Sequence, residues 1–390
     1  MKNTDLAKYC YQNKTTLLWL KHISFSHKKE EQLGAVEVNN VICLPDGAKV
    51  GAGFCGGVFD KNGVPIDSSF QRFGRKTAEK LFEIHECAPK RKISGKAVFL
   101  GQYRNQWGSF LVDSVSRLWY ADKNPGEYKY LLLATQEELG GIHKNAYKFL
   151  EYFGIAKEQI LYINEPVEVE SLIIPEMSYV PYGTHGKAPI WSEKYLETIH
   201  KVTDSVLSNF SGEDYPEKVY FSRGKFSKNQ KTDFGEEMLA ELMQKNGYYI
   251  VYPEEHTLEE QICYVNKCKE FASVGGSCAH NIIFSKTAPK MTLFNRMNGY
   301  QWHQWMLDEM AGVEPITYVD SYSEPYKPFF ETTLSGPYLF WINKNVKSYA
   351  FDNGFALPKI GVKQKAAILT RYSLRAAKTK LSKIKRRIFK

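Results

Sequence analysis

Several features that mark metal-dependent and disulfide-stabilised proteins are missing from this sequence. The seven cysteines are an odd number, and none of them forms a C-x-x-C spacing. We therefore expect reduced structural thiols instead of zinc ligands or disulfides. No Asp-x-Asp occurs, although this carboxylate pair usually holds Mg²⁺ or Mn²⁺ against a nucleotide diphosphate. We expect a site without a metal.

Enzyme signatures built on glycine-rich loops are also scarce. The sequence has no G-x-x-x-x-G-K-[ST] and no G-x-S-x-G, which argues against P-loop kinases and α/β-hydrolases. One G-x-G-x-x-G occurs at 51–56, but no helical pattern follows it. The strand–turn–helix context of a dinucleotide-binding site is therefore absent, and this argues against a dehydrogenase.

Long hydrophobic runs are absent as well. The apolar stretch at 17–20 is four residues long. A secretory signal core needs roughly 7–15 apolar residues, and a membrane-spanning helix needs about 20. We expect a cytoplasmic protein.

Positive charge is concentrated at one end of the chain. The net charge is +9 over 390 residues, but residues 359–390 hold twelve Lys and Arg and no Asp or Glu. The other 40 basic and 43 acidic residues sum to −3. A basic groove through the whole fold is therefore not expected, and neither is a nucleic-acid partner.

Alternating strand and helix patterns predict an α/β protein with parallel sheets. The chain exceeds the roughly 250–300 residues at which one core usually divides. We predict domains at 1–210 and 217–345, a linker at 211–216, an irregular segment at 296–345, and a closing segment with a basic tail at 346–390. Predicted strands are 36–43, 97–100, 130–134, 159–163, 171–174, 218–222, 248–252, 270–274 and 290–294, and predicted helices are the segment from Gly108 onward, 136–153, 191–210, 234–246, 257–266 and 278–284.

A glycine-rich turn at 273–281, Ser-Val-Gly-Gly-Ser-Cys-Ala-His-Asn, lies between a predicted strand and a predicted helix. Free N–H groups and the helix dipole attract phosphate, and small residues such as Gly276 and Ser277 let it approach. A tight turn also needs glycine for purely structural reasons, so both interpretations stay open. His280 and Asn281 follow inside the helix, where a single histidine is more often structural than catalytic.

A polar loop follows the predicted strand at 218–222. It begins with Ser222 and Arg223 and includes Lys228 and Lys231. Loops at the carboxyl ends of strands form the ligand crevice of an open α/β sheet. Arg223 and a nearby lysine would then clamp a diphosphate through charge-assisted hydrogen bonds. Charge alone favours a solvated basic loop without a ligand. The loop is, however, expected to leave the same sheet edge as the glycine turn, and this position favours a role in ligand binding.

Three polar residues of the first domain are spaced by four positions. Ser109, Asp113 and Arg117 would lie close to one face of the helix that begins near Gly108. An aspartate with an arginine one turn away is either half of a structural ion pair or a general base whose pKa the arginine lowers. Viewed alone, the segment favours the structural interpretation.

Together these segments resemble glycosyltransferase family 61. Residues 108–119 are similar to the family's helix of the type G-H-F-x-x-D-x-x-x-R-L-W. The C-terminal half is similar to the family's Ser-Arg strand end, acidic helix start, glutamine-bearing helix and glycine turn, at 222–223, 236–237, 260–262 and 276–284. Two departures occur, since Ser109 and Gly275 stand where many members carry histidine.

The resemblance implies a GT-B architecture, in which two Rossmann-like domains face a cleft. It also implies an inverting, metal-independent reaction with a nucleotide-sugar donor, expected to be UDP-linked, that binds mainly to the C-terminal half. The expected acceptor is a saccharide or a lipid-linked saccharide. The expected process is the synthesis of a bacterial surface polysaccharide such as capsule or lipopolysaccharide.

The same resemblance suggests residue roles. Inversion needs a base that takes the proton of the acceptor hydroxyl and positive groups that stabilise the departing diphosphate. We expect Asp113 to be the base. The other expected site residues are Arg223, Lys231, Gly276 and Ser277 at the donor diphosphate, Glu260 and Gln261 at the donor nucleoside, and Ser109, Arg117, His280 and Asn281 at the acceptor or elsewhere in the cleft.

The basic tail has apolar residues at every third or fourth position. Such a helix, with basic residues beside its apolar stripe, is typical of an interfacial membrane helix. Each basic residue near an anionic surface contributes about 1 kcal/mol. We expect peripheral association with the inner face of the cell membrane through residues 359–390, against the alternatives of a nucleic-acid arm or a disordered end. The stripe is Ala367, Thr370, Leu374, Ala377, Leu381, Ile384 and Ile388, flanked by Arg371, Arg375, Lys378, Lys385 and Arg386.

Two other functions remain open. A non-catalytic nucleotide- or sugar-binding module would also lack the two family histidines. A GT-B transferase of a sugar phosphate or polyol phosphate would use the same sheet and the same phosphate-binding turn.

Overall fold

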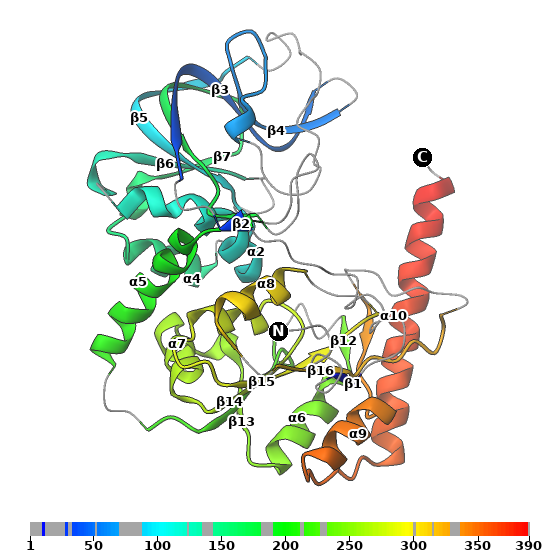
Figure 1. The fold of residues 1–390 in the computed structure, drawn as a ribbon. Helices are drawn as coiled ribbons and strands as arrows, with labels where there is room; N and C mark the ends of the chain where they lie inside the picture. Colours follow the sequence, from blue (N-terminus) through cyan, green and yellow to red (C-terminus); the bar gives the residue numbers. More distant parts are fainter. Residues whose placement is uncertain are drawn as a thin grey trace. The chain divides into compact units, whose positions relative to one another are not determined.

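The structure of the chain is a computed structural model. The residues that it describes are 10–11, 28–29, 33–50, 53–69, 88–122, 125–134, 143–180, 190–210, 214–226, 232–298, 302–313, 316–327 and 336–388. The chain forms two compact units (Figure 1). We call Phe25–Asn209 the N-terminal unit, and Phe210–Lys390 together with Met1–Ser24 the C-terminal unit. Both contain helices and parallel strands, so the prediction of an α/β protein is confirmed.

The N-terminal unit contains a six-stranded mixed sheet. Its strands, in spatial order, are β4 (Gly53–Phe59), β3 (Ala35–Val50), β8 (Val167–Pro175), β5 (Arg91–Gln102), β6 (Lys129–Leu133) and β7 (Ile160–Ile163). β3 is antiparallel to both of its neighbours, whereas the remaining pairs are parallel. A separate small sheet is formed by β2 (Lys28–Lys29), β10 (Ile190–Trp191) and β9 (Tyr179–Val180).

The helix predicted from Gly108 onward is helical but not a regular α-helix. It passes from α2 (Trp107–Ser109) through a π-helical segment (Phe110–Ser114) into a 3₁₀-helical segment (Val115–Asp122). Apolar spacings of three and four indicate a helix without distinguishing these types. The described part of this unit also contains the α-helices α4 (Lys144–Glu151) and α5 (Glu193–Asn209). Residues 136–142, predicted to begin the first of them, lie outside the described residues.

The C-terminal unit is built on a six-stranded parallel sheet. Its strands, in spatial order, are β1 (Cys10–Tyr11), β16 (Ile316–Asp320), β15 (Lys290–Asn295), β14 (Glu270–Val274), β11 (Lys218–Phe221) and β13 (Tyr249–Val251). From β11 the chain moves outward to β13 and then crosses back to β14, β15 and β16. The strand order therefore reverses between β11 and β14, which creates a topological switch point.

The prediction of an irregular segment at 296–345 is wrong. The segment contains α8 (Trp302–Met310), β16 and β17 (Tyr338–Leu339). Several of its aromatic residues pack in the core, and Trp305 stacks on the buried Tyr318 with ring centroids 5.6 Å apart. Aromatic and β-branched residues favour half-buried strands, and that signal was missed.

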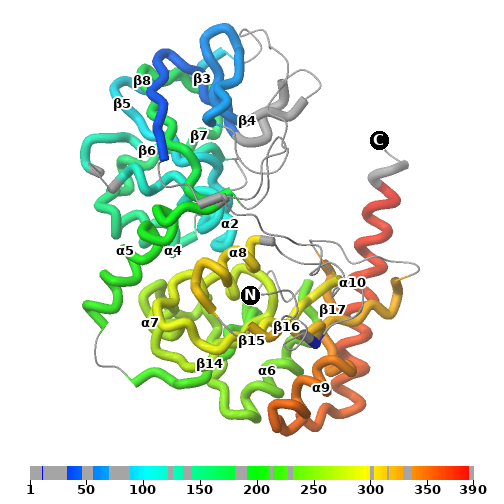
Figure 2. Tube along the Cα trace, viewed as in Figure 1, coloured from blue at the N-terminus to red at the C-terminus, as the bar shows by residue number. Residues whose placement is uncertain are grey.

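Helices cover both faces of the parallel sheet. One apolar cluster joins the sheet to α6 (Glu236–Lys245) and α9 (Lys344–Asp352), and Figures 1 and 2 both show these helices side by side. The other face packs on α7 (Leu258–Lys267), α8 and the segment Ala279–Phe284. That last segment is a 3₁₀-helix, where the sequence analysis predicted an ordinary helix. Burial of both faces explains the continuous apolar runs of these strands.

The end of the chain forms one long helix, α10 (Val362–Ile388), that packs onto the C-terminal unit through its first half. Ile368 and Tyr372 are fully buried in a cluster with Phe234 and Leu339. These partners come from β12 (Asp233–Phe234) and β17, which pair with each other. The first half of α10, within the predicted closing segment and tail at 346–390, therefore belongs to the core of this unit.

The apolar stripe identified in the sequence lies on the opposite side of α10. Leu374, Leu381 and Ile384 are 68%, 60% and 42% exposed. At about 100° per residue they are on the far side of the helix from Ile368 and Tyr372. The helix thus has one apolar face that packs on the core and one that faces solvent. Within the described residues, no helix has the length and apolar character needed to span a membrane.

Truncation of Tyr372 tests whether α10 is part of the folded core. Its ring is fully buried and lies 6.0 Å from that of Phe234, so Tyr372→Ala should lower the free energy of unfolding by about 3 kcal/mol. The exposed neighbour Leu374 provides a control, since Leu374→Ala should change that free energy by less than about 0.5 kcal/mol. Urea unfolding measures both. Equal effects of the two substitutions would show that α10 does not pack in this way.

Candidate functional site

Two of the predicted motifs meet at the switch point of the C-terminal unit. β11 and β14 are neighbouring parallel strands, with Phe221 paired to Ser273, so the loops after them leave the same edge of the sheet. Arg223 Nη1 donates a hydrogen bond of 3.3 Å to the Gly275 carbonyl oxygen. The expectation that the Arg223 loop and the glycine turn share one edge is confirmed. Open α/β sheets bind ligands at such a point.

Gly276 brings two cations against the backbone of the turn. Its φ of +146° is one that residues with a side chain rarely adopt. A Cβ here would lie 2.6 Å from Arg223 Nη1 and 3.4 Å from Arg296 Nη1. Glycine therefore serves the backbone conformation and the close approach of the Arg223 guanidinium, and Arg296 lies beside them. Ser277 follows as a partly buried residue of the turn, and Lys231 lies outside the described residues.

Arg296 was not among the predicted site residues. It follows β15 directly, and its guanidinium lies over the ring of Tyr338, 4.5 Å from the ring centroid. Burial, and then the charge of Arg223, lower the pKa of Arg296. A basic residue at the end of a predicted parallel strand was the signal that identified the Arg223 loop, and it was overlooked here.

Two carboxyl groups hold the Arg223 loop in place. Asp233 Oδ2 forms an ion pair with Arg223 Nη1 at 3.3 Å. Glu236 Oε1 accepts hydrogen bonds from the Ser222 hydroxyl at 2.8 Å, the Arg223 backbone N–H at 3.0 Å and the Tyr220 hydroxyl at 3.2 Å. Glu236 is fully buried, and this burial raises its pKa to about 7. The β12–α6 corner thus fixes both the backbone and the side chain of Arg223.

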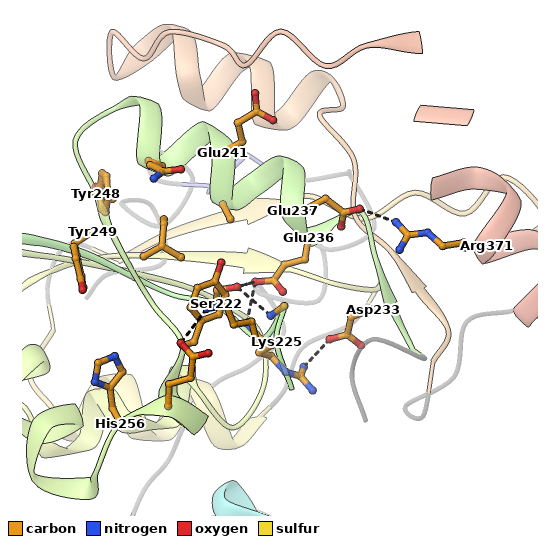
Figure 3. A pocket seen from close by; sticks show the side chains of 17 residues that line it. Ser222, Lys225, Asp233, Glu236, Glu237, Glu241, Tyr248, Tyr249, His256 and Arg371 are labelled. Atoms are coloured by element: carbon orange, nitrogen blue, oxygen red, sulfur yellow. Dashed lines mark hydrogen bonds and ion pairs between the residues drawn. The ribbon is translucent and has the colours of Figure 1, made fainter. Parts of the chain in front are cut away.

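A cavity of about 1020 Å³ adjoins the Arg223 loop (Figure 3). Lys225 borders it and forms an ion pair of 3.0 Å with Glu255. The Lys225 ammonium group also lies 4.1 Å from the ring centroid of Tyr252. On the α6 side, Figure 3 shows Glu237 joined to Arg371 of α10 at 2.9 Å. The cavity has the size of a small-molecule site.

Glu260 and Gln261, the predicted nucleoside-binding residues, make structural contacts. Glu260 Oε2 accepts a hydrogen bond of 2.7 Å from the Thr257 N–H, and Thr257 Oγ1 accepts one of 3.2 Å from the Glu260 N–H, so the two cap α7. The buried Gln261 amide donates to the Pro253 carbonyl oxygen at 2.8 Å and accepts from the Asn281 amide at 2.9 Å. Nucleoside binding by Glu260 or Gln261 stays a prediction.

His280 belongs to a buried polar network. Its Nδ1 lies 2.8 Å from Gln304 Oε1, and the Gln304 amide donates to Asp308 at 2.6 Å. Asp308 also accepts a hydrogen bond of 3.0 Å from the Tyr318 hydroxyl, and burial raises its pKa to about 7. The network joins the 3₁₀-helix after the glycine turn to α8 and β16. This agrees with the structural interpretation of His280.

The predicted residues of the N-terminal unit differ in environment. Asp113 is 5% exposed and lies in the π-helical segment, a type of helix that is frequent at functional sites. Arg117 is fully buried, donates to the Pro175 carbonyl oxygen and lies over the Phe99 ring at 5.4 Å. Arg117, expected in the cleft, therefore supports the core. Ser109 is partly buried at the end of α2.

The part of the chain that the structure describes contains no candidate metal site, and its cysteine next to the glycine turn is not activated. No three His, Cys, Asp or Glu residues there are grouped so that they could hold a metal ion. Cys43, Cys268 and Cys278 are free thiols. Burial raises the pKa of Cys278, next to the glycine turn, to about 12, so this thiol is not an activated nucleophile. The expectation of metal independence stays a prediction.

Substitution of Glu236 tests its buried, raised-pKa environment. A carboxyl group with a pKa of 4.5 when unfolded and about 7 when folded keeps its proton only in the folded state between these values. Its stabilising contribution is present at low pH and is lost as the pH rises through 7. Glu236→Gln keeps the oxygen acceptor without the charge. As the pH rises from 5 to 8, the melting temperature of the variant should therefore increase relative to that of the wild type. A difference in melting temperature that does not depend on pH would contradict this assignment.

Comparison with known proteins gives one family match. Residues 107–293 match the family model Glycosyltransferase 61. The matched region begins at α2, contains Asp113, Arg223 and Gly276, and ends within β15, three residues before Arg296. Among curated proteins none matches the chain. The chain therefore contains a region of the glycosyltransferase 61 type, which supports its assignment as a glycosyltransferase.

Proposed function

We propose that the protein is an inverting, metal-independent glycosyltransferase. It moves a sugar from a nucleotide-sugar donor, expected to be UDP-linked, to a saccharide or lipid-linked acceptor in the synthesis of a surface polysaccharide. The observation that carries the proposal is the meeting of Arg223 and the Gly276 turn at the switch point, inside the region of the family match. A cation and a glycine turn at this position suit a diphosphate.

The reaction is a single displacement at the anomeric carbon. The acceptor oxygen forms the new glycosidic bond while the bond from the anomeric carbon to the diphosphate oxygen breaks. Asp113 takes the proton of the acceptor hydroxyl as general base. Arg223, with Lys231 and the amides of Gly276 and Ser277, stabilises the charge that develops on the departing nucleoside diphosphate. A GT-B arrangement of the two units would bring these groups together.

The membrane location rests on α10. Its solvent-facing apolar stripe includes Leu374, Leu381 and Ile384, and basic residues such as Lys378 and Lys385 lie beside that stripe. A helix with this composition adsorbs in the plane of an anionic membrane. The opposite face of α10 is held by the core, so adsorption would place the C-terminal unit directly at the membrane surface.

The catalytic proposal is tested by separating donor binding from turnover. A thermal-shift screen against nucleotide sugars identifies the donor, because a ligand that binds the folded state raises its stability. Arg223→Met should then weaken donor binding by about tenfold or more. Asp113→Asn should keep donor affinity and lower transfer by about 10² to 10⁴. Lys269→Met, at the amino end of β14, removes the same charge as a control and should change neither.

Several outcomes would contradict this proposal. Near-normal turnover of Asp113→Asn would exclude Asp113 as the base, and unchanged donor affinity of Arg223→Met would exclude the clamp. Donor binding without transfer or hydrolysis would identify a binding module instead. Release of a nucleoside monophosphate would identify a transferase of sugar or polyol phosphate.

Membrane association is tested with substitutions on the exposed stripe of α10. Deletion of the tail would also remove Tyr372 from the core, so point variants are the better design. The triple variant Leu374→Ser, Leu381→Ser and Ile384→Ser should lose binding to phosphatidylglycerol vesicles by about tenfold or more in co-sedimentation. Phe351→Ser, at an exposed position of α9, is the matched control. Equal binding of the triple variant and the wild type would refute the membrane role of α10.

A further inference from the structure

The switch-point turn holds two positive charges side by side. Arg223 reaches Gly276 from the end of β11, and Arg296 reaches it from the end of β15. A side chain at Gly276 would collide with the Arg223 guanidinium, 2.6 Å from the Cβ position, and would contact that of Arg296 at 3.4 Å. Like charges in a partly buried place repel each other. Such an arrangement is stabilised when an anion binds between them.

The carboxylates nearby do not neutralise both cations. Asp233 is paired with Arg223 at 3.3 Å. Arg296 forms no ion pair among the residues that the structure describes, and its buried Nε has no hydrogen-bond partner there. A buried donor without a partner is costly in a folded protein. This orphaned Nε indicates that the partner is a ligand.

The contact of Arg296 with Tyr338 uses none of the hydrogen-bond donors of Arg296. The guanidinium lies over the ring, 4.5 Å from the centroid, so the ring occupies the face of the cation. All five N–H donors of a guanidinium lie in its plane. Tyr338 therefore holds the orientation of Arg296 without using any of the donors that bind a phosphate.

We propose that Arg296 is the second arm of the donor clamp and that Arg223 and Arg296 together bind a diphosphate across the Gly276 turn. This inference rests on the proposed donor site and adds a residue outside the family match. Two guanidinium groups from different strands suit a ligand with two phosphate groups. The site should therefore bind a diphosphate more tightly than a monophosphate.

The test uses inorganic pyrophosphate and inorganic phosphate as probes of the full chain. Isothermal titration at constant ionic strength should show tighter binding of pyrophosphate. Arg296→Met and Arg223→Met should each weaken pyrophosphate binding by about tenfold or more, whereas Arg296→Lys should recover only part of the loss, since lysine has no planar fork. Lys269→Met is the charge-matched control and should bind pyrophosphate like the wild type.

A second measurement separates ligand binding from a structural role. If Arg296 serves the ligand, Arg296→Met without ligand should melt at the wild-type temperature or higher, because a partly buried cation beside another cation is removed. The rise in melting temperature caused by pyrophosphate should then disappear. A large drop in the melting temperature of the ligand-free variant would overturn the proposal. Tyr338→Leu keeps the charge of Arg296 but removes the ring on which its guanidinium stacks. This variant should lose less pyrophosphate affinity than Arg296→Met.

Loss of the second arm and loss of the whole donor site would give different binding results. If Arg223→Met weakens pyrophosphate binding and Arg296→Met does not, the second arm is refuted and the donor site stands. If neither substitution affects pyrophosphate binding, the switch-point clamp is refuted altogether. Equal affinity for phosphate and pyrophosphate would also overturn the assignment of a diphosphate site.

Discussion

The parallel pairing of β11 with β14 is the constraint on which the candidate site depends. It places the Arg223 loop beside the glycine turn, while the chain leaves the two strands in opposite directions across the sheet. Gly276 can accept the close approach of Arg223 because it has no side chain, and Arg296 reaches the same turn. Without this strand pairing, Arg223 and Arg296 would be separate cations in loops that do not meet at the glycine turn.

The β12–α6 corner connects this crevice to the end of the chain. Asp233 and Glu236 position Arg223, and Phe234 between them is packed against Tyr372 of α10. The first half of α10 is therefore no loose appendage, because it packs on the same corner that positions Arg223. Helix α10, with one face in the core and one apolar face in solvent, thus connects the corner that positions Arg223 to an exposed apolar stripe.

Burial also determines the charge of the site. Glu236 is fully enclosed, and its raised pKa of about 7 reduces the negative charge next to Arg223 at neutral pH. Asp233 then remains the main compensating carboxylate for two guanidinium groups. The positive charge is therefore concentrated where Arg223 and Arg296 approach the Gly276 turn.

The sequence by itself determined the α/β class, most strands and helices of the C-terminal unit, and the placement of Arg223 and the glycine turn at one sheet edge, because apolar periodicity and glycine position are local signals. Only the tertiary structure decided which cations converge and which polar residues are buried. Arg296 comes from a third strand, Arg117 and His280 are enclosed, and α10 has a second apolar face. These outcomes depend on which surfaces meet, and no local pattern contains that information.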